Sequence, residues 1–145
     1  MASVDVSSVI GAGIERVWAI VRDFNNMPHW HPLLDRSRIE GGAPSDQIGC
    51  VRNFYLTDGG NIRERLLSLS DRDHSFWYSI LESPMPLTNY VAGLELQKIT
   101  DGDRTFARWR ATFNCAPEDE DGLVTLIGAD VFQAAFDALN ARLAG

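Results

Sequence analysis

Glu64 is the residue of this chain best placed to do chemistry, because it is a carboxylate inside a stretch with the pattern of a strand. Successive side chains of a strand point to opposite faces of the sheet, so Glu64 shares a face with Ile62 and Leu66. Arg63 and Arg65 occupy the other face, which is therefore the solvent-exposed one. An unpaired, ionised carboxylate is costly in an apolar interior, so we expect Glu64 to be paired or protonated.

Arg52 is the expected partner of Glu64. It lies in phase with Cys50, Phe54 and Leu56 on the preceding predicted strand, which places it on the same apolar face. The pair has two interpretations that the residues alone leave open. It could hold two strands in register, or it could form a site in which Glu64 transfers a proton and the planar donors of Arg52 hold an oxyanion or carboxylate.

Tyr78 and Tyr90 add two further polar groups to the predicted inner face. Buried polar atoms need hydrogen-bond partners, and four such side chains in one interior favour a cavity that holds a ligand or water. If Tyr90 donates to the same substrate oxygen, then Arg52, Glu64 and Tyr90 form a candidate catalytic set. This set suits proton transfer beside a carbonyl, as in cyclisation, dehydration or tautomerisation, and it needs no metal or organic cofactor.

Aromatic and aliphatic side chains are predicted to surround the catalytic set. They either pack against the C-terminal helix and fill the interior, or they leave a cavity for a small hydrophobic molecule with an oxygen function. The apolar, proline-containing loop over 83–88 either gates this cavity or forms a rigid turn. The candidate ligand-binding residues are Phe54, Tyr78, Leu94, Trp109, Phe132, Phe136 and Trp30.

The histidines and cysteines do not indicate a metal site. His29 and His31 flank Trp30, but two ligands without a nearby carboxylate or cysteine make a poor metal site. We therefore predict that they pack or line the rim of the cavity, and that no metal is bound. The spacing of Cys50 and Cys115 fits neither a zinc motif nor a disulfide framework, so both are predicted to be small buried residues.

The spacing of apolar residues predicts the elements that position these side chains. Helical spacing predicts a helix over 14–23, and a proline-rich stretch predicts a helical turn over 25–32. Alternating patterns between turn signals predict strands over 4–10, 34–40, 50–57, 61–70, 75–82, 90–99 and 105–115.

A long C-terminal helix over 123–143 decides the fold class. It has a broad apolar face and a length of about 33 Å, so it needs a large apolar surface to lie on. A curved antiparallel sheet of six or seven strands is the one such surface that the pattern supplies. We therefore predict an α+β fold in one domain over 1–145, with the sheet wrapped around the helix and two short helices after the first strand.

The charge of the chain bears on its partners. The 145 residues carry a formal net charge of −7, which argues against duplex DNA and anionic membranes, because both attract basic faces. The N-terminus lacks the pattern of a secretory signal, and we expect no apolar run near membrane-spanning length. We predict a cytoplasmic protein that is a monomer or a homodimer, with a small hydrophobic molecule as its partner.

Five motifs distributed along the chain match those of a known superfamily. They are 17–24, Trp30-His31-Pro32, Gly49-Cys50-Val51-Arg52, Arg63-Glu64-Arg65-Leu66 and Asn89-Tyr90-Val91-Ala92. On these motifs the chain resembles the SRPBCC or START-like helix-grip superfamily, which contains polyketide cyclases, ligand carriers, abscisic-acid receptors and chaperone-activator-type interaction modules.

One branch of this superfamily bears most directly on the candidate site. The chain is similar to the polyketide cyclase/dehydrase-like branch that includes lachrymatory factor synthase, whose implicated arginine, glutamate and tyrosine correspond to Arg52, Glu64 and Tyr90. The resemblance implies the helix-grip fold and an internal site for a hydrophobic ligand. It leaves open whether this chain is an enzyme, a carrier or sensor, or an interaction module.

Overall fold

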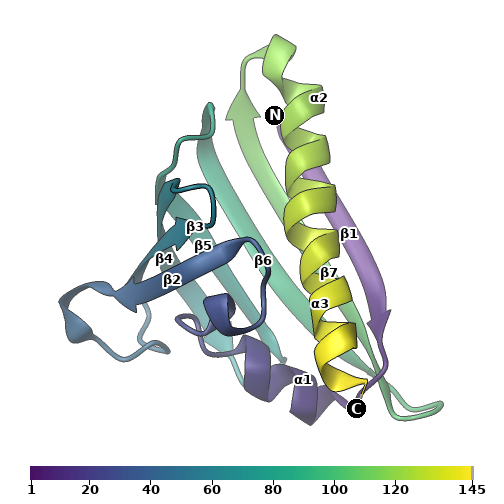
Figure 1. Ribbon diagram of the computed structural model, residues 1–145. Helices are drawn as coiled ribbons and strands as arrows, with labels where there is room; N and C mark the ends of the chain where they lie inside the picture. The colour runs from purple at the N-terminus through teal and green to yellow at the C-terminus, as the bar shows by residue number, and fades with distance from the viewer. Residues whose placement is uncertain (145) are drawn as a thin grey trace.

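One antiparallel sheet of seven strands and one long helix make up most of the structure (Figure 1). The computed structural model describes residues 1–144. The strands lie in the order β1-β7-β6-β5-β4-β3-β2. In chain order, the elements are β1 (Ala2–Ile10), α1 (Ile14–Val21), η1 (Met27–His29), β2 (Leu34–Ile39), η2 (Glu40–Gly42), β3 (Val51–Leu56), β4 (Asn61–Ser70), β5 (Ser75–Glu82), β6 (Leu87–Ile99), β7 (Arg104–Cys115), α2 (Pro117–Thr125), η3 (Leu126–Gln133) and α3 (Ala134–Leu143).

The arrangement confirms the predicted α+β helix-grip fold. Two short helices follow β1, and the C-terminal helix of α2, η3 and α3 lies across the part of the sheet that contains β1, β7 and β6 (Figure 1). The helix begins at Pro117, six residues before the predicted start. Proline is suited to the first helical position, and Glu118, Asp119 and Glu120 follow it in the first turn, where acidic side chains are favoured by the helix dipole.

The middle of the C-terminal helix is a π-helix, η3, in which hydrogen bonds span five residues. The buried side chains follow this change, because Ile127 and Phe132 are five residues apart, whereas Leu123 and Ile127 are four apart. The wider turn keeps Phe132 facing the sheet. It also leaves Val131, which a regular spacing of four would bury, only half-buried.

The length and apolar composition of Pro117–Leu143 would also allow this helix to span a membrane. Our expectation that no run approaches that length was therefore wrong, because the predicted segment over 123–143 is long enough by itself and has only Asp130, Asp137 and Arg142 as charged residues. Its buried side chains, among them Leu123, Ile127, Phe132 and Phe136, belong to the hydrophobic core that the sheet and helix share. Packing on the sheet accounts for the apolar face of the helix.

Strands β5 and β6 separate over part of their length. Ser75–Ser79 pair with residues 91–95 of β6, but the rest of β5 pairs only with β4, through Ile80 opposite Glu64 and Glu82 opposite Arg63. The first residues of β6 pair instead with β7, and a bulge lies between Thr88 and Val91. The sheet is therefore parted beside the connecting loop over 83–86.

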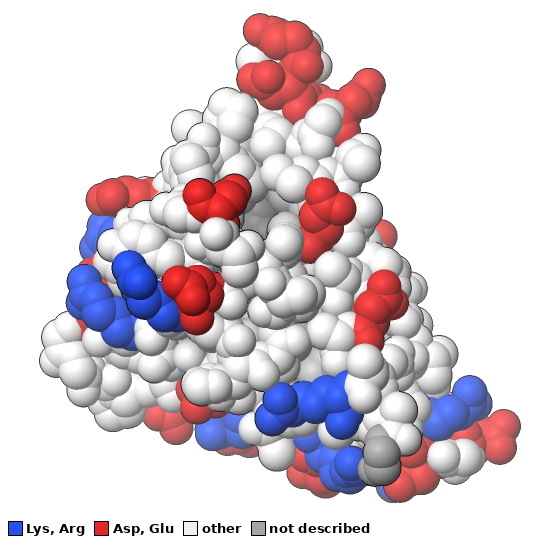
Figure 2. Space-filling model, viewed as in Figure 1, with Lys and Arg blue, Asp and Glu red and all other residues white. Residues whose placement is uncertain are grey.

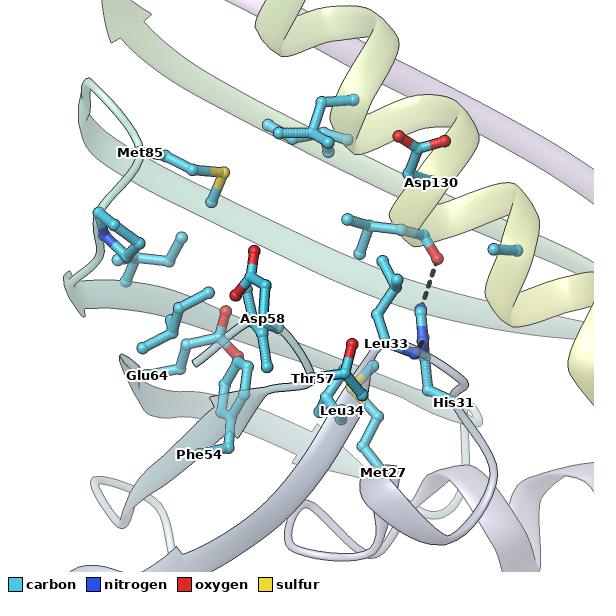
Figure 3. A pocket seen from close by; sticks show the side chains of 18 of the residues that line it. Met27, His31, Leu33, Leu34, Phe54, Thr57, Asp58, Glu64, Met85 and Asp130 are labelled. Carbon is cyan, nitrogen blue, oxygen red and sulfur yellow. Dashed lines mark hydrogen bonds between the residues drawn. The ribbon is translucent and has the colours of Figure 1, made fainter. Parts of the chain in front are cut away.

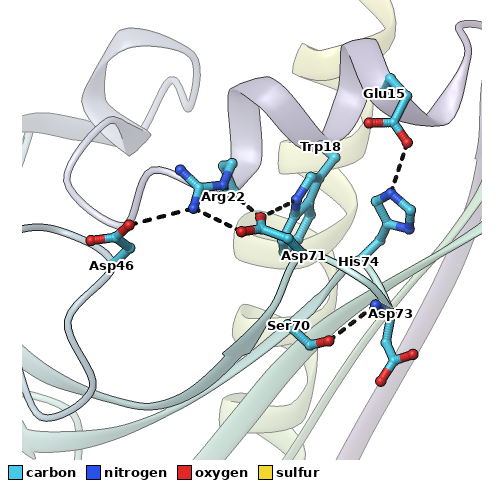
Figure 4. A network of polar contacts seen from close by, with 8 residues as sticks. All are labelled: Glu15, Trp18, Arg22, Asp46, Ser70, Asp71, Asp73 and His74. Atoms are coloured by element: carbon cyan, nitrogen blue, oxygen red, sulfur yellow. Dashed lines mark hydrogen bonds and ion pairs between the residues drawn. The ribbon is translucent and has the colours of Figure 1, made fainter.

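A polar network holds α1 against the turn between β4 and β5 (Figure 4). The indole nitrogen of Trp18 donates to Asp71 Oδ1 at 2.7 Å, and Arg22 Nε donates to the same oxygen at 2.8 Å. Arg22 also lies 3.6 Å from Asp46 in the loop between β2 and β3. This anchoring places the segment after α1, which contains Phe24, beside the inner face of the sheet.

Candidate functional site

A cavity of about 650 Å³ lies between the sheet and the C-terminal helix (Figure 3). Side chains from β3, β4 and β5 form one wall, and residues of α2 and η3 form the opposite wall. Asp58 and Asp130 line the cavity and are exposed to solvent, so they mark its mouth. On the face seen in Figure 2, the surface is hollowed between acidic side chains. The volume is that of a small-molecule site.

Arg52 and Glu64 meet on the inner face of the sheet, as their strand phase predicts. They are directly opposite each other in the β3–β4 ladder. Arg52 Nε donates to Glu64 Oε1 at 2.8 Å, and Nη2 of the same guanidinium lies 2.6 Å from that oxygen. Both side chains are buried, with 2% of Arg52 and 5% of Glu64 exposed. The pair is therefore desolvated, and its geometry is set by the register of two strands.

Glu64 Oε2 makes no hydrogen bond within residues 1–144, and Glu64 lines the cavity. Figure 3 shows its carboxylate among the side chains of the cavity wall. Burial raises the pKa of Glu64 above its ordinary value of 4.5, and the charge and hydrogen bond of Arg52 oppose this rise without cancelling it. Glu64 is thus a carboxyl with one oxygen held and the other available to a ligand.

Arg52 is held by groups other than Glu64 as well. Its Nη1 donates to the backbone carbonyl oxygen of Phe24 at 3.0 Å. The guanidinium carbon lies 3.9 Å from the ring centre of Phe24 and 4.9 Å from that of Tyr78. Cation–π contacts of this kind stabilise a buried guanidinium. Arg52 is therefore fixed in place, and its main contact is Glu64.

Two tyrosines form the far side of this polar cluster. Trp109 Nε1 donates to the Tyr78 hydroxyl at 3.1 Å, and the rings of Tyr78 and Tyr90 lie 6.4 Å apart. Burial raises the pKa of both tyrosines, and the neighbouring Glu64 adds to this effect. Both hydroxyls are therefore protonated at neutral pH, and Tyr90, which lines the cavity, can donate a hydrogen bond to a ligand.

His31 joins the cavity wall to the C-terminal helix. Its Nε2 lies 2.8 Å from the carbonyl oxygen of Val131, and its Nδ1 accepts the Leu33 N–H at 3.1 Å. These partners require a neutral ring with the proton on Nε2. Burial lowers the pKa of His31, which agrees with this neutral state. The predicted packing or rim role describes this position, since His31 is buried and lines the cavity.

The structure brings five of the predicted site residues together. Arg52, Glu64, Tyr90, Phe54 and Tyr78 all line the cavity. Their common feature is their place on β3, β4, β5 and the start of β6, at the half of the sheet that the C-terminal helix does not cover closely (Figure 1).

The remaining predicted ligand-binding residues do not line the cavity. Trp109 stacks on Phe132 with ring centres 4.9 Å apart, and it lies 6.0 Å from Phe136, so these rings fill the space between the sheet and the helix. Leu94 is fully buried in the same core. Trp30 packs beside His31 with its indole nitrogen unpaired in the part of the chain that the structure describes. A position on the inner face of the sheet does not by itself predict that a residue lines the cavity, because most of that face packs directly against the helix.

Several cavity residues were missed by sequence reasoning. Asp58 lies in the turn between β3 and β4, and Asp130 lies on the part of the helix whose phase the π segment changes. The loop between β5 and β6 was expected either to gate the cavity or to form a rigid turn. Its residues Pro84, Met85 and Pro86 line the cavity, which is compatible with both interpretations. The apolar composition of that loop indicated these residues in the sequence, whereas no comparable signal singled out Asp58 or Asp130.

The described residues 1–144 contain no group of three or more His, Cys, Asp and Glu side chains placed to hold a metal ion. Cys50 is buried and Cys115 is half-buried, and neither forms a disulfide. The arrangement therefore supplies a carboxyl, a guanidinium and two phenols beside an apolar space. Such groups can bind an oxygen-bearing molecule and move a proton on it.

Known proteins share this architecture. Protein XoxI from Bacillus cereus has 28% sequence identity and a TM-score of 0.88, and the match covers 99% of this chain and 96% of that chain. A protein from Thermobifida fusca has 30% identity and a TM-score of 0.87, covering 98% of this chain and 93% of that one. An uncharacterised protein from Bacillus thuringiensis, at 27% identity over 99% of this chain and 100% of that chain, has a TM-score of 0.87.

A curated relative matches a shorter part of the chain. The abscisic acid receptor PYL7 of Arabidopsis thaliana is 29% identical over 97 residues, which are 64% of this chain and 44% of the receptor. The matched stretch therefore spans less than half of the receptor's length. The sequence model of one family, described as polyketide cyclase / dehydrase and lipid transport, matches residues 1–144. Its match over nearly the whole chain agrees with the helix-grip fold, and the protein belongs to this polyketide cyclase/dehydrase and lipid transport family of the SRPBCC superfamily.

Proposed function

We propose that the protein binds a small hydrophobic molecule with an oxygen function in this cavity and catalyses cofactor-free proton transfer on it. The observation that carries the proposal is the state of Glu64. This carboxyl is 5% exposed, is held by Arg52 through one oxygen, and presents its other oxygen to the cavity. The description of the family, which includes cyclases and dehydrases, supports the same class of chemistry.

In this proposal Glu64 acts first as a base and then as an acid. It removes a proton from a carbon beside a carbonyl group, and Tyr90 donates a hydrogen bond to the enolate oxygen that forms. Glu64 then returns the proton to a different atom of the same molecule, which completes an isomerisation without any further reactant. The raised pKa of Glu64 suits this role, because a base works best when its pKa approaches the working pH.

Arg52 has a positioning role in this scheme. One of the two interpretations of the pair from the sequence was that the donors of Arg52 hold a substrate oxygen, but its closest contacts are Glu64 and the carbonyl oxygen of Phe24. Arg52 would therefore orient the carboxyl and support its ionised form during the transfer. Tyr90 remains the candidate donor to the substrate oxygen.

Hydrogen exchange on the bound molecule tests the proposal. Native mass spectrometry of freshly purified protein identifies a co-purified ligand, which is then incubated with the protein in D₂O. We expect the native protein to exchange a carbon-bound hydrogen for deuterium, and Glu64→Gln to slow this exchange by about 10² or more while affinity changes little. Glu118→Gln, an exposed change in the first turn of α2, serves as the control. Equal exchange rates in all three proteins would contradict a catalytic role for Glu64.

Ligand carriage or sensing without catalysis is the second candidate function. The observation in its favour is that Arg52 already pairs with Glu64, so the two could serve only to hold β3 and β4 in register. The similarity to an abscisic acid receptor points the same way. In that case the co-purified molecule keeps its carbon-bound hydrogens in D₂O, although it binds the cavity.

An interaction module of the chaperone-activator type is the third class considered from the sequence. Such a module would need no open space beside Glu64. The cavity of about 650 Å³ at that position counts against it. The proposals for a monomer or homodimer, for the absence of nucleic acid and for a cytoplasmic location stay predictions.

A further inference from the structure

The charges around the cavity are unbalanced. Arg52 is the one Lys or Arg side chain among the described residues that line it, and its charge is already paired with Glu64. His31 also lines the cavity, but the hydrogen bonds of its two ring nitrogens require it to be neutral. A ligand that enters this cavity therefore meets no unpaired positive charge on its wall.

The mouth of the cavity is negative. Asp58 lies in the turn between β3 and β4, and Asp130 lies on η3, so the two carboxylates approach the mouth from opposite walls (Figure 3). Asp58 Oδ1 accepts the Gly60 N–H at 2.8 Å, and neither aspartate forms an ion pair within residues 1–144. Figure 2 shows acidic side chains on either side of the hollow and no basic side chain beside it.

A second, independent feature lies deep in the cavity. Glu64 Oε2 has no hydrogen-bond partner in the described part of the chain, although Glu64 is only 5% exposed. This oxygen is open to the cavity rather than sealed in the core, so a donor from the ligand or from water can reach it. A ligand carboxylate would bring a third negative group toward Asp58 and Asp130, because the charge of Glu64 is already balanced by Arg52. A ligand with donors at both ends would satisfy the deep oxygen and the mouth together.

We propose that the ligand of this cavity is an oxygen-bearing hydrophobic amine. Its ammonium group lies at the mouth with Asp58 and Asp130, its apolar body fills the cavity, and its oxygen-bearing end donates to Glu64 Oε2. This rests on the proposed function, because it names the ligand class of the same cavity. If two ligands have the same apolar body, the carboxylates at the mouth attract the one that carries an ammonium group and repel the one that carries a carboxylate. The two aspartates therefore act as specificity-determining residues at the mouth.

Three matched probes test the proposal: naphthylmethylamine, naphthylmethanol and naphthoate share one apolar body and are cationic, neutral and anionic. Methyl resonances of the methionines report binding and its location, because Met27 and Met85 line the cavity whereas Met1 is 94% exposed. We expect the amine to shift Met27 and Met85 with an affinity about tenfold or more above that of naphthoate, since each mouth charge contributes modestly in water. Added salt should narrow this difference.

The double variant Asp58→Asn with Asp130→Asn tests whether these two carboxylates cause the preference for the amine. We expect it to lower the affinity for the amine by about tenfold and to change that for the alcohol by less than about twofold. Asp137→Asn is the matched control, because Asp137 lies on the same helix away from the cavity and its bond from Gln133 is compatible with asparagine. This control should leave all three affinities unchanged.

Three results would overturn the proposal. If naphthoate binds as tightly as the amine, or the double variant keeps the preference for the amine, the mouth does not select charge. When naphthylmethanol still shifts Met27 and Met85 in that experiment, the cavity remains a ligand site and the proposed function stands. If none of the three probes shifts these methyl groups, the ligand class and cavity binding of such molecules both fail.

Discussion

Arg52 and Glu64 show how strand register can assemble a charged pair in an apolar core. They are opposite each other in the β3–β4 ladder, so their contact does not depend on a flexible loop. The desolvation cost of two buried charges is large, and it is offset only while both partners are present. Removing one partner should therefore cost far more than removing both.

Arg52→Leu should lower the free energy of unfolding by about 3–5 kcal/mol, because it leaves the buried Glu64 carboxyl without its partner. The double change Arg52→Leu with Glu64→Leu should recover most of this loss. Urea denaturation of the variants gives these values. Arg108→Leu is the comparison on the outer face, where Arg108 pairs with Asp5 in solvent, and it should cost much less than Arg52→Leu. A double variant as unstable as the single one would contradict this account of the pair.

The raised pKa of Glu64 predicts a specific dependence of stability on pH. Because the native carboxyl keeps its proton above the ordinary pKa of 4.5, its contribution to stability is complete below that value and is lost as pH rises through the native pKa. The difference in unfolding free energy between the native protein and Glu64→Gln should therefore fall on going from about pH 4 to about pH 8. A difference that rises with pH would show that the effect of Arg52 on the pKa of Glu64 is larger than the effect of burial.

At the scale of elements, the β5–β6 pair depends on one glycine. Gly93 lies opposite Trp77, and a Cβ atom at this position would lie 2.2 Å from Trp77 Cδ2. The indole ring therefore covers the glycine directly. Residue 93 must therefore be glycine, and the alternation of polar and apolar residues along the strand does not reveal this requirement.

Gly93→Ala should destabilise the protein by roughly 1–3 kcal/mol, because the new methyl group forces Trp77 to move. Adding Trp77→Ala should remove this clash, so the alanine at 93 should cost little in that background. Gly122→Ala is the matched control, since nothing lies within 4 Å of its Cβ position in helix α2. It should instead stabilise the protein by about 0.5–1 kcal/mol. Thermal unfolding of the variants measures these changes, and equal effects of the two glycine substitutions would rule out the proposed clash.

The sequence predicted the elements and the phase of the strands well, for a physical reason. Alternation along β3 and β4 follows burial, so Arg52 and Glu64 could be placed on the inner face. The same reasoning could not tell which part of that face is open. Trp109 and Tyr78 both point inward, but Trp109 is covered by Phe132 of the helix and only Tyr78 borders the cavity.

Two features of the site depend on tertiary structure that one sequence does not reveal. The π segment changes the phase of the helix after Ile127, and regular helical spacing therefore misplaces Val131 and its neighbours. Asp58 belongs to the cavity only because the short β3–β4 turn reaches the mouth. Both depend on packing between elements that are distant in the chain.

At the scale of the whole molecule, one hydrophobic core joins β1 at the N-terminus to the helix at the C-terminus. We predict that the chain is a single domain and expect it to unfold in one cooperative transition. Tryptophan fluorescence and far-UV circular dichroism should give the same midpoint in urea, because Trp18, Trp30 and Trp109 all lie in that core. Two separate transitions would show that parts of the chain fold independently.

The separation of the end of β5 from the start of β6 affects how quickly a ligand can bind and dissociate. No backbone hydrogen bond of the described sheet joins the end of β5 to the first residues of β6, and both Ile80 and Tyr90 in these stretches border the cavity. The end of β5 and the start of β6 can therefore move apart when these strands bend. During this motion β5 stays paired with β4, and β6 stays paired with β7. The residence time of a bound molecule would then be set by local opening on the timescale of loop motion, and it would be far shorter than the lifetime of the folded state.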